Sequence, residues 1–459
     1  MIAVGIRLSA RRILQPSPRE KNHDAEDLVG GNPASFYFKE GAVAMGPKKS
    51  DLAINGGKPV HSKPWGDGPF HFSAEISALK KLLSGPALPL ARGKAVMAYR
   101  EALTELYGMK YAVPTSSGSA AIHVALAAAG IGAGDEVILS PLTDYGSVIG
   151  IFQLNAIPVF ADVQPNNLLM DVDSVASRIT PHTRVVMPVH NGGYAVDMRP
   201  LMRLARKHDL IVLEDCAQAH LASIKGKYLG TFGQLGAWST NESKHMKSGE
   251  GGFILTNNRK MAETADLFSD KCYPRFPGAP KTPAFPALNV RLSDVNAALA
   301  AVQLKRVPKW IEQRQAFGET FEAGIQGIPG LIPHPQPKGT KPSYWWAMFV
   351  VDPDVMGVNA AKFCKMVAAE GIPVSSGPQR YVVEWEVFRE LHEDPKVFNS
   401  YRPGRLKKRS FPLEACPNAQ TYHEAVCAIR VTQHNTKTEA RAAARAIRKV
   451  TGTLLGRKI

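Results

Sequence analysis

From about residue 51 to residue 258, the chain alternates short apolar runs with amphipathic stretches of helical periodicity. The runs are apolar almost throughout, so each predicts a strand that is buried on both faces. They are Tyr111–Thr115, Glu136–Ser140, Ile157–Ala161, Val185–Val189, Ile211–Asp215, Ala237–Ser239 and Phe253–Thr256. Amphipathic stretches such as Ser119–Ala129 and Arg199–His208 lie between several of them. This order predicts an α/β fold in which helices cover both faces of a mostly parallel sheet.

The two ends of the chain have different patterns. Residues 1–49 are polar, mixed in charge and without sustained periodicity, which predicts a disordered tail. The same segment is basic at its start, so a transit peptide or an amphipathic anchor is the alternative. Ser293–Ile311 has a strong helical pattern and predicts a bridge between domains. We therefore expect a large domain over residues 50–300 and a smaller α+β domain over residues 301–459.

Composition narrows the class of protein. The 459 residues are 44% hydrophobic and 21% charged, which is typical of a globular protein and excludes disordered, collagen-like and coiled-coil classes. Five widely spaced cysteines without a CxxC pair argue against a disulfide framework or a zinc site. We therefore expect no metal and a reducing, cytoplasmic location. No apolar stretch reaches the roughly 18 residues needed to span a bilayer, so no membrane association is expected.

The formal net charge of +16 first suggests a nucleic-acid partner. Its distribution weakens that suggestion. Residues 401–459 carry 13 Lys and Arg against 3 Asp and Glu, and residues 1–50 carry 8 against 5, which leaves a net charge of +3 for residues 51–400. The run Arg402–Arg409 could attract a nucleotide diphosphate, although a solvated basic face is the simpler interpretation. We expect no nucleic-acid partner.

The first segment that suggests chemistry is Pro114–Ser119, which follows a predicted strand and opens a helix. Small hydroxyl residues and a glycine at a helix N-terminus leave free N–H groups for a phosphate. A simple serine N-cap is the alternative.

The second segment is Ile211–His220, in which Glu214 and Asp215 end an apolar run. This places a carboxylate at the carboxyl edge of the sheet, where α/β proteins bind ligands, unless the strand end merely faces solvent. Side chains alternate along a strand, so only one of the two acids can face the site.

The third segment is Ser239–Gly252, a polar loop that carries Lys244 and Lys247 and ends in a glycine-rich turn. A reactive lysine needs a lowered pKa, and the two lysines compete for that role. Phosphate site, strand-end acid and loop lysine in this order are what a protein contributes to pyridoxal phosphate chemistry.

With these segments in place, the chain resembles the DegT/DnrJ/EryC1/StrS family of pyridoxal phosphate-dependent sugar aminotransferases, from about Leu52 to Val450. The segments similar to family motifs are Ala53–Pro59, Ser117–His123, Pro188–Gly193, Glu214–His220, Ser243–Met246 followed by Gly249–Gly252, and Asn289–Arg291. The resemblance implies the aspartate aminotransferase-like fold, fold type I of the pyridoxal phosphate-dependent transferases, with a smaller C-terminal α+β domain.

Carried over by position, the resemblance assigns Lys244, rather than Lys247, as the Schiff-base lysine. It implies that Asp215 pairs with the pyridine nitrogen and that Gln218 lies near the phenolic oxygen of the ring. Further implied positions are Gly118, Ser119 and Ser239 at the phosphate, Asn289 at a phosphate of the partner subunit in a homodimer with shared sites, and His190 and Arg291 as weaker substrate-lining candidates.

One segment departs from the family pattern. Where the family usually has an aromatic residue over the cofactor ring, Thr143–Ser147 has Asp144. Tyr145 is then the alternative stacking residue, and Asp144 either contacts a substrate hydroxyl or caps the helix that follows. Trp345 and Trp346 are interpreted as packing residues at a domain junction, with a substrate-facing position as the alternative.

The resemblance implies transfer of an amino group from glutamate or glutamine to a keto-sugar, nucleotide-linked in many relatives, or to a keto-cyclitol. Some relatives carry His at the lysine position and dehydrate sugars, so Lys244 favours transamination. A dehydratase or another non-transaminase of the same fold remains the alternative, and a regulatory nucleic-acid-binding protein with a borrowed fold is a third hypothesis.

Overall fold

The computed structural model describes residues 48–70, 72–85, 88, 93–273, 275–278, 281–390 and 411–459. The predicted tail, except for its last two residues, and the run Arg402–Arg409 lie outside these ranges. Within the described ranges, no helix is both long enough and apolar enough to cross a membrane. The domain boundary at residue 300 stays a prediction.

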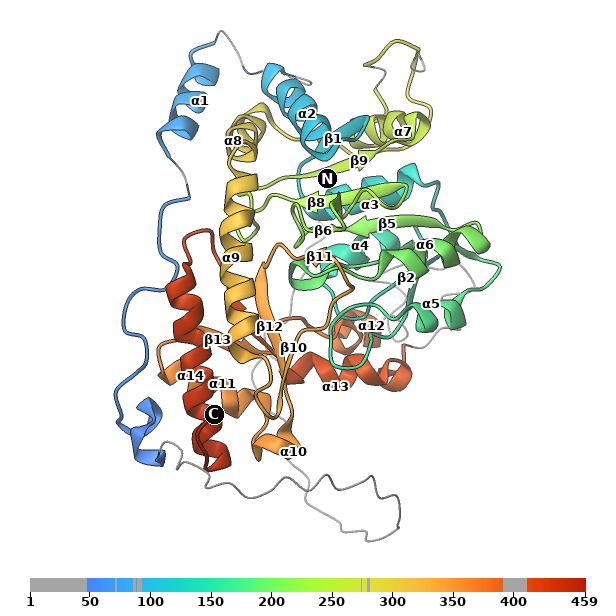
Figure 1. Ribbon diagram of the computed structural model, residues 1–459. Coiled ribbons are helices and arrows are strands. Elements are labelled where there is room, and N and C mark those ends of the chain that lie inside the picture. The colour runs from blue at the N-terminus through green and yellow to red at the C-terminus, as the bar shows by residue number, and fades with distance from the viewer. Residues whose placement is uncertain are drawn as a thin grey trace, which may run out of the picture. The chain divides into compact units, whose positions relative to one another are not determined.

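A seven-stranded sheet forms the centre of the first half of the chain (Figure 1). Its strands follow the order β1-β9-β8-β5-β4-β2-β3, and only β9 runs antiparallel to its neighbours. The strands are β1 (Tyr111–Thr115), β2 (Glu136–Leu139), β3 (Ile157–Phe160), β4 (Thr183–Met187), β5 (Ile211–Asp215), β8 (Leu235–Ser239) and β9 (Gly252–Thr256). The mostly parallel sheet predicted from the apolar runs is thus confirmed, with end shifts of one or two residues.

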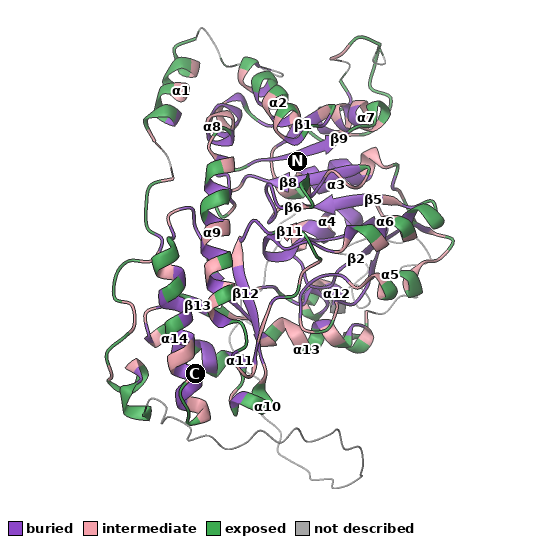
Figure 2. Ribbon diagram, in the orientation of Figure 1, coloured by how far each residue is buried: buried purple, intermediate pink, exposed green. Residues whose placement is uncertain are grey.

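This sheet packs against the helices α2 (Lys94–Tyr107), α3 (Gly118–Ala128), α4 (Tyr145–Gln153), α6 (Met198–Lys207) and α7 (Arg259–Ser269). Helix α5 (Val172–Arg178) packs against α6, and α1 (Ser73–Leu83), whose one buried residue is Glu75, packs against α8 (Asp294–Leu304). In Figure 2 the strands are almost entirely buried, whereas α6 exposes one side. Trp238 of β8 stacks on Phe253 of β9, with ring centroids 4.8 Å apart, and this pair fixes the two strands that carry the lysine loop between them.

Ser293–Ile311 is helical as its pattern predicts, and it contributes to two helices. Helix α8 (Asp294–Leu304) ends before Lys305, and α9 (Val307–Ile325) begins two residues later with Pro308 in its first turn. Proline lacks an N–H group and clashes with the carbonyl of the preceding turn, so a continuous helix cannot pass through this position. Helix α9 then runs beside the C-terminal helix α14 (Lys437–Leu455) (Figure 1).

The second half of the chain builds a four-stranded antiparallel sheet in the order β10-β12-β14-β13. Its elements are β10 (Leu331–Pro333), β12 (Trp346–Val351), α10 (Pro353–Met356), α11 (Ala360–Ala369), β13 (Val374–Ser376), α12 (Glu386–Glu390), α13 (Pro417–Ala425) and β14 (Val426–Arg430). The short strands β6 (Ser223–Ile224), β7 (Lys227–Tyr228) and β11 (Thr340–Lys341) form a third sheet, which ties the two halves together. All five cysteines are buried free thiols.

Candidate active site

The carboxyl end of β5 places a buried acid at the sheet edge. Asp215 is 4% exposed, and its carboxylate accepts hydrogen bonds from Ser147 Oγ at 2.7 Å and from the N–H of Ala217 at 3.0 Å. Burial raises the pKa of Asp215, while the two hydrogen bonds and the nearby charge of Lys244 lower it. No cation among the described residues lies within ion-pair distance of this carboxylate. Burying a carboxylate without a cationic partner is costly, so Asp215 is suited to hold a cation that binds beside it.

The neighbouring acid, Glu214, is held in a different way. Its two oxygens accept hydrogen bonds from the N–H groups of Gly230, Phe232 and Gly233 at 2.7 to 2.8 Å. His190 completes the cluster: its Nδ1 accepts from the N–H of Val196, so its Nε2 carries the proton and donates to Glu214 at 3.2 Å. His190 has no exposed surface, which does not match its predicted place at a substrate.

The N-terminus of α3 lies against the end of β8. Ser117 caps the helix by accepting from the N–H of Ala120, which leaves the N–H groups of Gly118 and Ser119 at the open end. A Cβ atom at Gly118 would lie 2.5 Å from Cβ of Ser239, so only glycine permits this approach. The cap and the phosphate interpretation of this segment are therefore compatible, because Ser117 serves as the cap and the next two N–H groups remain available.

The lysine loop is a hairpin excursion between β8 and β9. Its neck is closed by Thr240 and Ser248, whose hydroxyls are 2.7 Å apart and whose backbones are hydrogen-bonded. Within the loop, the N–H of Lys244 donates to the carbonyl of Asn241. These bonds fix the start of the lysine side chain at the same sheet edge as Asp215.

The amine of Lys244 lies over the ring of Trp345, 4.3 Å from the ring centroid. The Trp345 indole N–H donates to the carbonyl of Ser243, which anchors the ring beneath the lysine. Burial lowers the pKa of Lys244, and the charges of Asp215 and Asp144 oppose that shift. A lowered pKa keeps a larger share of the amine neutral and nucleophilic near neutral pH. Lys247 points elsewhere, with its amine 3.4 Å from the ring centroid of Phe70.

Helix α4 brings Thr143–Ser147, the segment that departs from the family pattern, to this edge of the sheet. Asp144 is exposed and caps α4 by accepting from the N–H of Gly146 at 2.8 Å, which fits the capping alternative. Tyr145 is half-buried, and its ring contacts Trp385 at 5.6 Å between centroids. One turn into the helix, Ser147 reaches Asp215 and also hydrogen-bonds Thr143 Oγ1 at 2.7 Å.

Gln218 lies just beyond Asp215 and is 6% exposed. Its Oε1 accepts from the N–H of Gly192 at 2.7 Å, and its Nε2 donates to Oε1 of Gln379 at 3.3 Å. The glutamine therefore joins the turn after β4 to the second half of the chain.

Asn289 and Arg291 run beside the end of β1, because Arg291 pairs with Thr115 and the N–H of Ser116 donates to the carbonyl of Val290. Asn289 is exposed, whereas Arg291 forms an ion pair with Asp270, which also binds Arg275. The guanidinium of Arg291 is thus held by an ion pair within its own chain. The exposed side chain of Asn289 takes no part in that ion pair.

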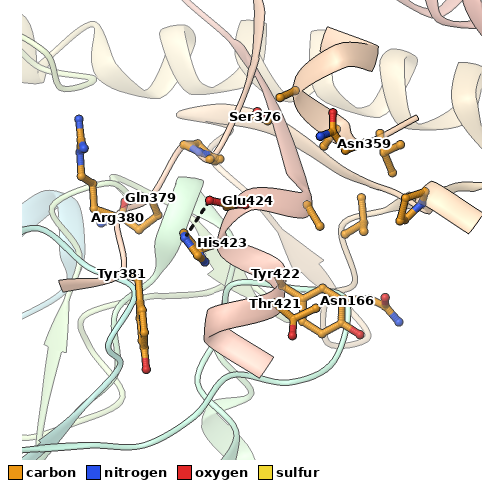
Figure 3. A pocket seen from close by; sticks show the side chains of 18 of the residues that line it. Asn166, Asn359, Ser376, Gln379, Arg380, Tyr381, Thr421, Tyr422, His423 and Glu424 are labelled. Atoms are coloured by element: carbon orange, nitrogen blue, oxygen red, sulfur yellow. Dashed lines mark ion pairs between the residues drawn. The ribbon is translucent and has the colours of Figure 1, made fainter. Parts of the chain in front are cut away.

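A large cavity of about 1120 Å³, with both polar and apolar walls, lies among β12, β13 and α13 (Figure 3). Its walls include Gln379 and Arg380 from one side and the His423–Glu424 ion pair of α13 from another. Lys244 and Asp215 do not line it, and its link to the site is the hydrogen bond between Gln379 and Gln218. Volume alone therefore does not mark the reactive centre.

Two residues at the site escaped the sequence prediction. Ser147 stands one turn after a helix cap, and the need of a buried strand-end acid for a donor was the signal that could have drawn attention to it. Trp345 was interpreted as a packing residue, but it lies beneath Lys244 and lines a cavity with it, so the substrate-facing alternative describes it better.

The family model of the DegT/DnrJ/EryC1/StrS aminotransferases matches residues 73–401 of the chain. The protein belongs to this family. The resemblance stated from the motifs is thereby confirmed, and with it the pyridoxal phosphate-dependent aminotransferase class and fold.

Named relatives of this aminotransferase include the L-glutamine:2-deoxy-scyllo-inosose aminotransferase of Micromonospora echinospora. It is 33% identical over 344 residues, which cover 70% of this chain and 79% of the relative. The GDP-perosamine synthase of Vibrio cholerae is 34% identical over 267 residues, covering 57% and 71% of the two chains. The solved structure of an aminotransferase from Psychrobacter cryohalolentis superposes with a TM-score of 0.71 at 27% identity, over 84% of this chain and 97% of that one.

Proposed function

We propose that this aminotransferase moves an amino group from L-glutamine or L-glutamate to the ketone of a keto-cyclitol or of a keto-sugar, including nucleotide-linked sugars. The observation that carries the proposal is that Lys244, an amine with a lowered pKa, lies at the same sheet edge as Asp215, a buried carboxylate with no described cation within ion-pair distance. The relatives' names supply the substrates: one specifies L-glutamine and a scyllo-inosose, and another is a GDP-sugar synthase.

The residues fit pyridoxal 5'-phosphate at three points. Asp215 would hold the pyridine nitrogen protonated, since a cation there satisfies the buried carboxylate. The N–H groups of Gly118 and Ser119, with the Ser239 hydroxyl beside them, would bind the phosphate. Gln218 and Tyr145 would flank the ring, although the bonds that Gln218 already makes suit a positioning role.

When bound, this cofactor supplies an aldehyde that reacts with amines and a ring that accepts electrons. Lys244 Nζ would be the nucleophile toward that aldehyde and, once displaced by the amine of the donor, would carry the proton between the carbon that bears the amino group and the cofactor. Asp215 would hold its negative charge against the ring nitrogen, and Ser147 Oγ, which donates to that carboxylate, would orient it. Trp345 covers one side of the amine, which limits the access of water and keeps the lysine close to its site of action.

A homodimer with shared sites completes the proposal. Asn289 is exposed next to the phosphate-binding segment of its own chain, so it is available to a partner subunit. The cytoplasmic location inferred from the cysteines likewise stays a prediction.

The direct test is Lys244→Ala. We expect loss of the visible absorbance of the lysine-bound cofactor and of turnover with L-glutamine and a keto-cyclitol. Lys365→Ala, at an exposed lysine of α11, serves as the matched control and should retain both. Retention of both signals by Lys244→Ala would exclude this lysine as the nucleophile.

The same assay separates transamination from dehydration. An aminotransferase incubated with L-glutamine or L-glutamate alone converts its cofactor to the amine form and releases the corresponding keto acid. A dehydratase leaves the donor unchanged, so the absence of keto acid with either donor would exclude the proposed reaction.

A further inference from the structure

A second, smaller cavity lies directly beside Lys244. It has a volume of about 260 Å³, and its walls carry a cluster of four cationic side chains. They are Lys244, Lys247, Arg314 and Arg430. Phe70, Trp345, Trp346 and one acid, Glu242, also line the cavity. The amine of Lys247 lies over the ring of Phe70 and that of Lys244 over the ring of Trp345.

Two of these cations are buried without a counter-ion. Arg314 is 3% exposed; its Nη1 donates to the uncharged carbonyls of Tyr344 and Val431, and its Nε has no partner among the described residues. Lys247 is 5% exposed, and no described carboxylate lies within ion-pair distance of it. Burying a charge without a partner is expensive, so this cavity is built for an anion.

The protonation equilibria agree with this geometry. Burial lowers the pKa of Arg314 to about 9, and the charge of Arg430 contributes to the shift. Burial also lowers the pKa of Lys247; the carboxylate of Glu242 opposes the shift, whereas Arg430 and Arg314 add to it. Glu242 is exposed, so it neutralises the cluster only in part.

The position and size of the cavity indicate which kind of anion it fits. The proposed cofactor phosphate belongs at Gly118, Ser119 and Ser239, none of which lines this cavity. Its volume is slightly below the roughly 300–1,000 Å³ of pockets that hold drug-sized ligands, which suits a small molecule better than a nucleotide-linked sugar. Lys244 opens into it, so a donor whose amine would take the place of that lysine on the cofactor would have its other groups among the cations.

We infer that this cavity binds the α-carboxylate of the amino donor, with Lys247 and Arg314 as its main partners and Arg430 at its rim. The inference rests on the proposed aminotransferase function and deepens it, because it assigns the residues that distinguish an amino acid from a simple amine. A guanidinium and an ammonium are the side chains that form strong charge-assisted hydrogen bonds with a carboxylate.

The test compares two donors in the holoenzyme: L-glutamine and L-glutaminamide, which lacks the α-carboxylate. The concentration dependence of cofactor conversion gives the apparent affinity for each. In Lys247→Met we expect the affinity for L-glutamine to fall about 10- to 100-fold and that for L-glutaminamide to change little, so that discrimination between the two shrinks. Lys247→Arg should restore most of the discrimination, since it restores the charge.

Two further variants are needed, a second test of the cation cluster and a control for the change in total charge. Arg430→Gln should cause a smaller loss in the same direction, and it does not disturb the buried bonds of Arg314. Lys365→Met makes the same change of total charge at an exposed site of α11 and should leave both donors unaffected.

The outcomes separate the two proposals. If the unaltered enzyme converts its cofactor with neither L-glutamine nor L-glutamate, the proposed function is wrong. If it does so but Lys247→Met keeps full discrimination, the carboxylate site is wrong while the function stands. A rise in the acceptor's KM alone in Lys247→Met would assign the cavity to a phosphate of the acceptor and overturn the inference.

Discussion

Two adjacent acids at the end of β5 lie in opposite surroundings. Glu214 is fully buried and receives three backbone N–H groups and an imidazole N–H, so both of its oxygens are occupied. Asp215 is almost as buried but receives only one hydroxyl and one N–H. The first environment already satisfies a carboxylate, whereas the second leaves it in need of a cation. The difference supports the proposal that Asp215 serves the reaction, whereas Glu214 stabilises the fold.

Asp215→Asn tests the functional half of this comparison and should have the largest effect. The amide oxygen can accept from the N–H of Ala217 while the amide NH₂ donates to Ser147 Oγ, but the side chain carries no charge to hold a protonated ring nitrogen. We expect turnover to fall roughly 10²–10³-fold, with stability unchanged or slightly higher because a buried charge is removed. Steady-state turnover and the denaturation midpoint measure the two effects. A variant with full turnover and lower stability would reverse the roles assigned here.

Glu214→Gln tests the structural half. The new amide NH₂ group cannot accept a hydrogen bond from the backbone N–H groups that it faces. At least one buried donor therefore loses its partner. We expect a loss of about 1–3 kcal/mol in the free energy of unfolding, measured by chemical denaturation. Turnover per folded molecule should stay close to that of the unaltered enzyme. A selective loss of turnover would show that the His190–Glu214 cluster takes part in the reaction.

Ser147→Ala sharpens the comparison by removing one of the two donors to Asp215. The carboxylate keeps the Ala217 N–H but loses its orientation, and we expect turnover to fall about tenfold. Ser147→Thr retains the hydroxyl and is the matched control. If the alanine and threonine variants have equal turnover, the hydroxyl does not position the acid.

A half-buried acid, Glu322 of α9, extends the comparison to hydroxyl donors. Burial raises the pKa of Glu322 to about 7, although hydrogen bonds from Tyr194 and Tyr344 oppose the shift. A folded-state pKa above the usual 4.5 means that its contribution to stability is fully present below about pH 4.5 and is lost as the pH rises through about 7. Glu322→Gln stays neutral, so its free energy of unfolding should rise relative to that of the unaltered chain across this range.

Denaturation at about pH 5 and at about pH 8 measures this effect, which we expect to be the smallest of the four. A difference between the two proteins that does not change with pH would mean that Glu322 keeps its charge in the folded protein. The hydroxyls of Tyr194 and Tyr344 would then satisfy the Glu322 carboxylate as well as the backbone N–H groups satisfy that of Glu214.

The sequence predicted the strands of the central sheet closely, because a strand buried on both faces must be apolar at almost every position. The helical pattern of Ser293–Ile311 was also confirmed, and the structure adds that two helices meet there, the second with Pro308 in its first turn. The domain boundary and the roles of the site residues stay predictions, since they depend on a cofactor and a partner subunit.

Candidate site residues could be proposed from the sequence wherever a residue type and its neighbours along the chain carry the chemistry. Asp215, Lys244 and Gly118 all follow strand ends or open helices, and these positions can be read from the local pattern. Ser147 and Trp345 reach the site across the fold, one from a helix turn and the other from a loop 101 residues after Lys244. Such contacts leave no periodic trace in the sequence.

The sequence by itself determined the fold class, the family and the order of the phosphate segment, the acid and the lysine. The tertiary structure decided which acid faces the site, because only the backbone N–H groups of residues 230–233 show that Glu214 is already satisfied. It also decided which of the two lysines lies over Trp345, and it gathered Lys247, Arg314 and Arg430 from three separate elements into one cavity. The reason is physical: the charge a site can hold depends on burial and on distances through space, and neither follows from spacing along the chain.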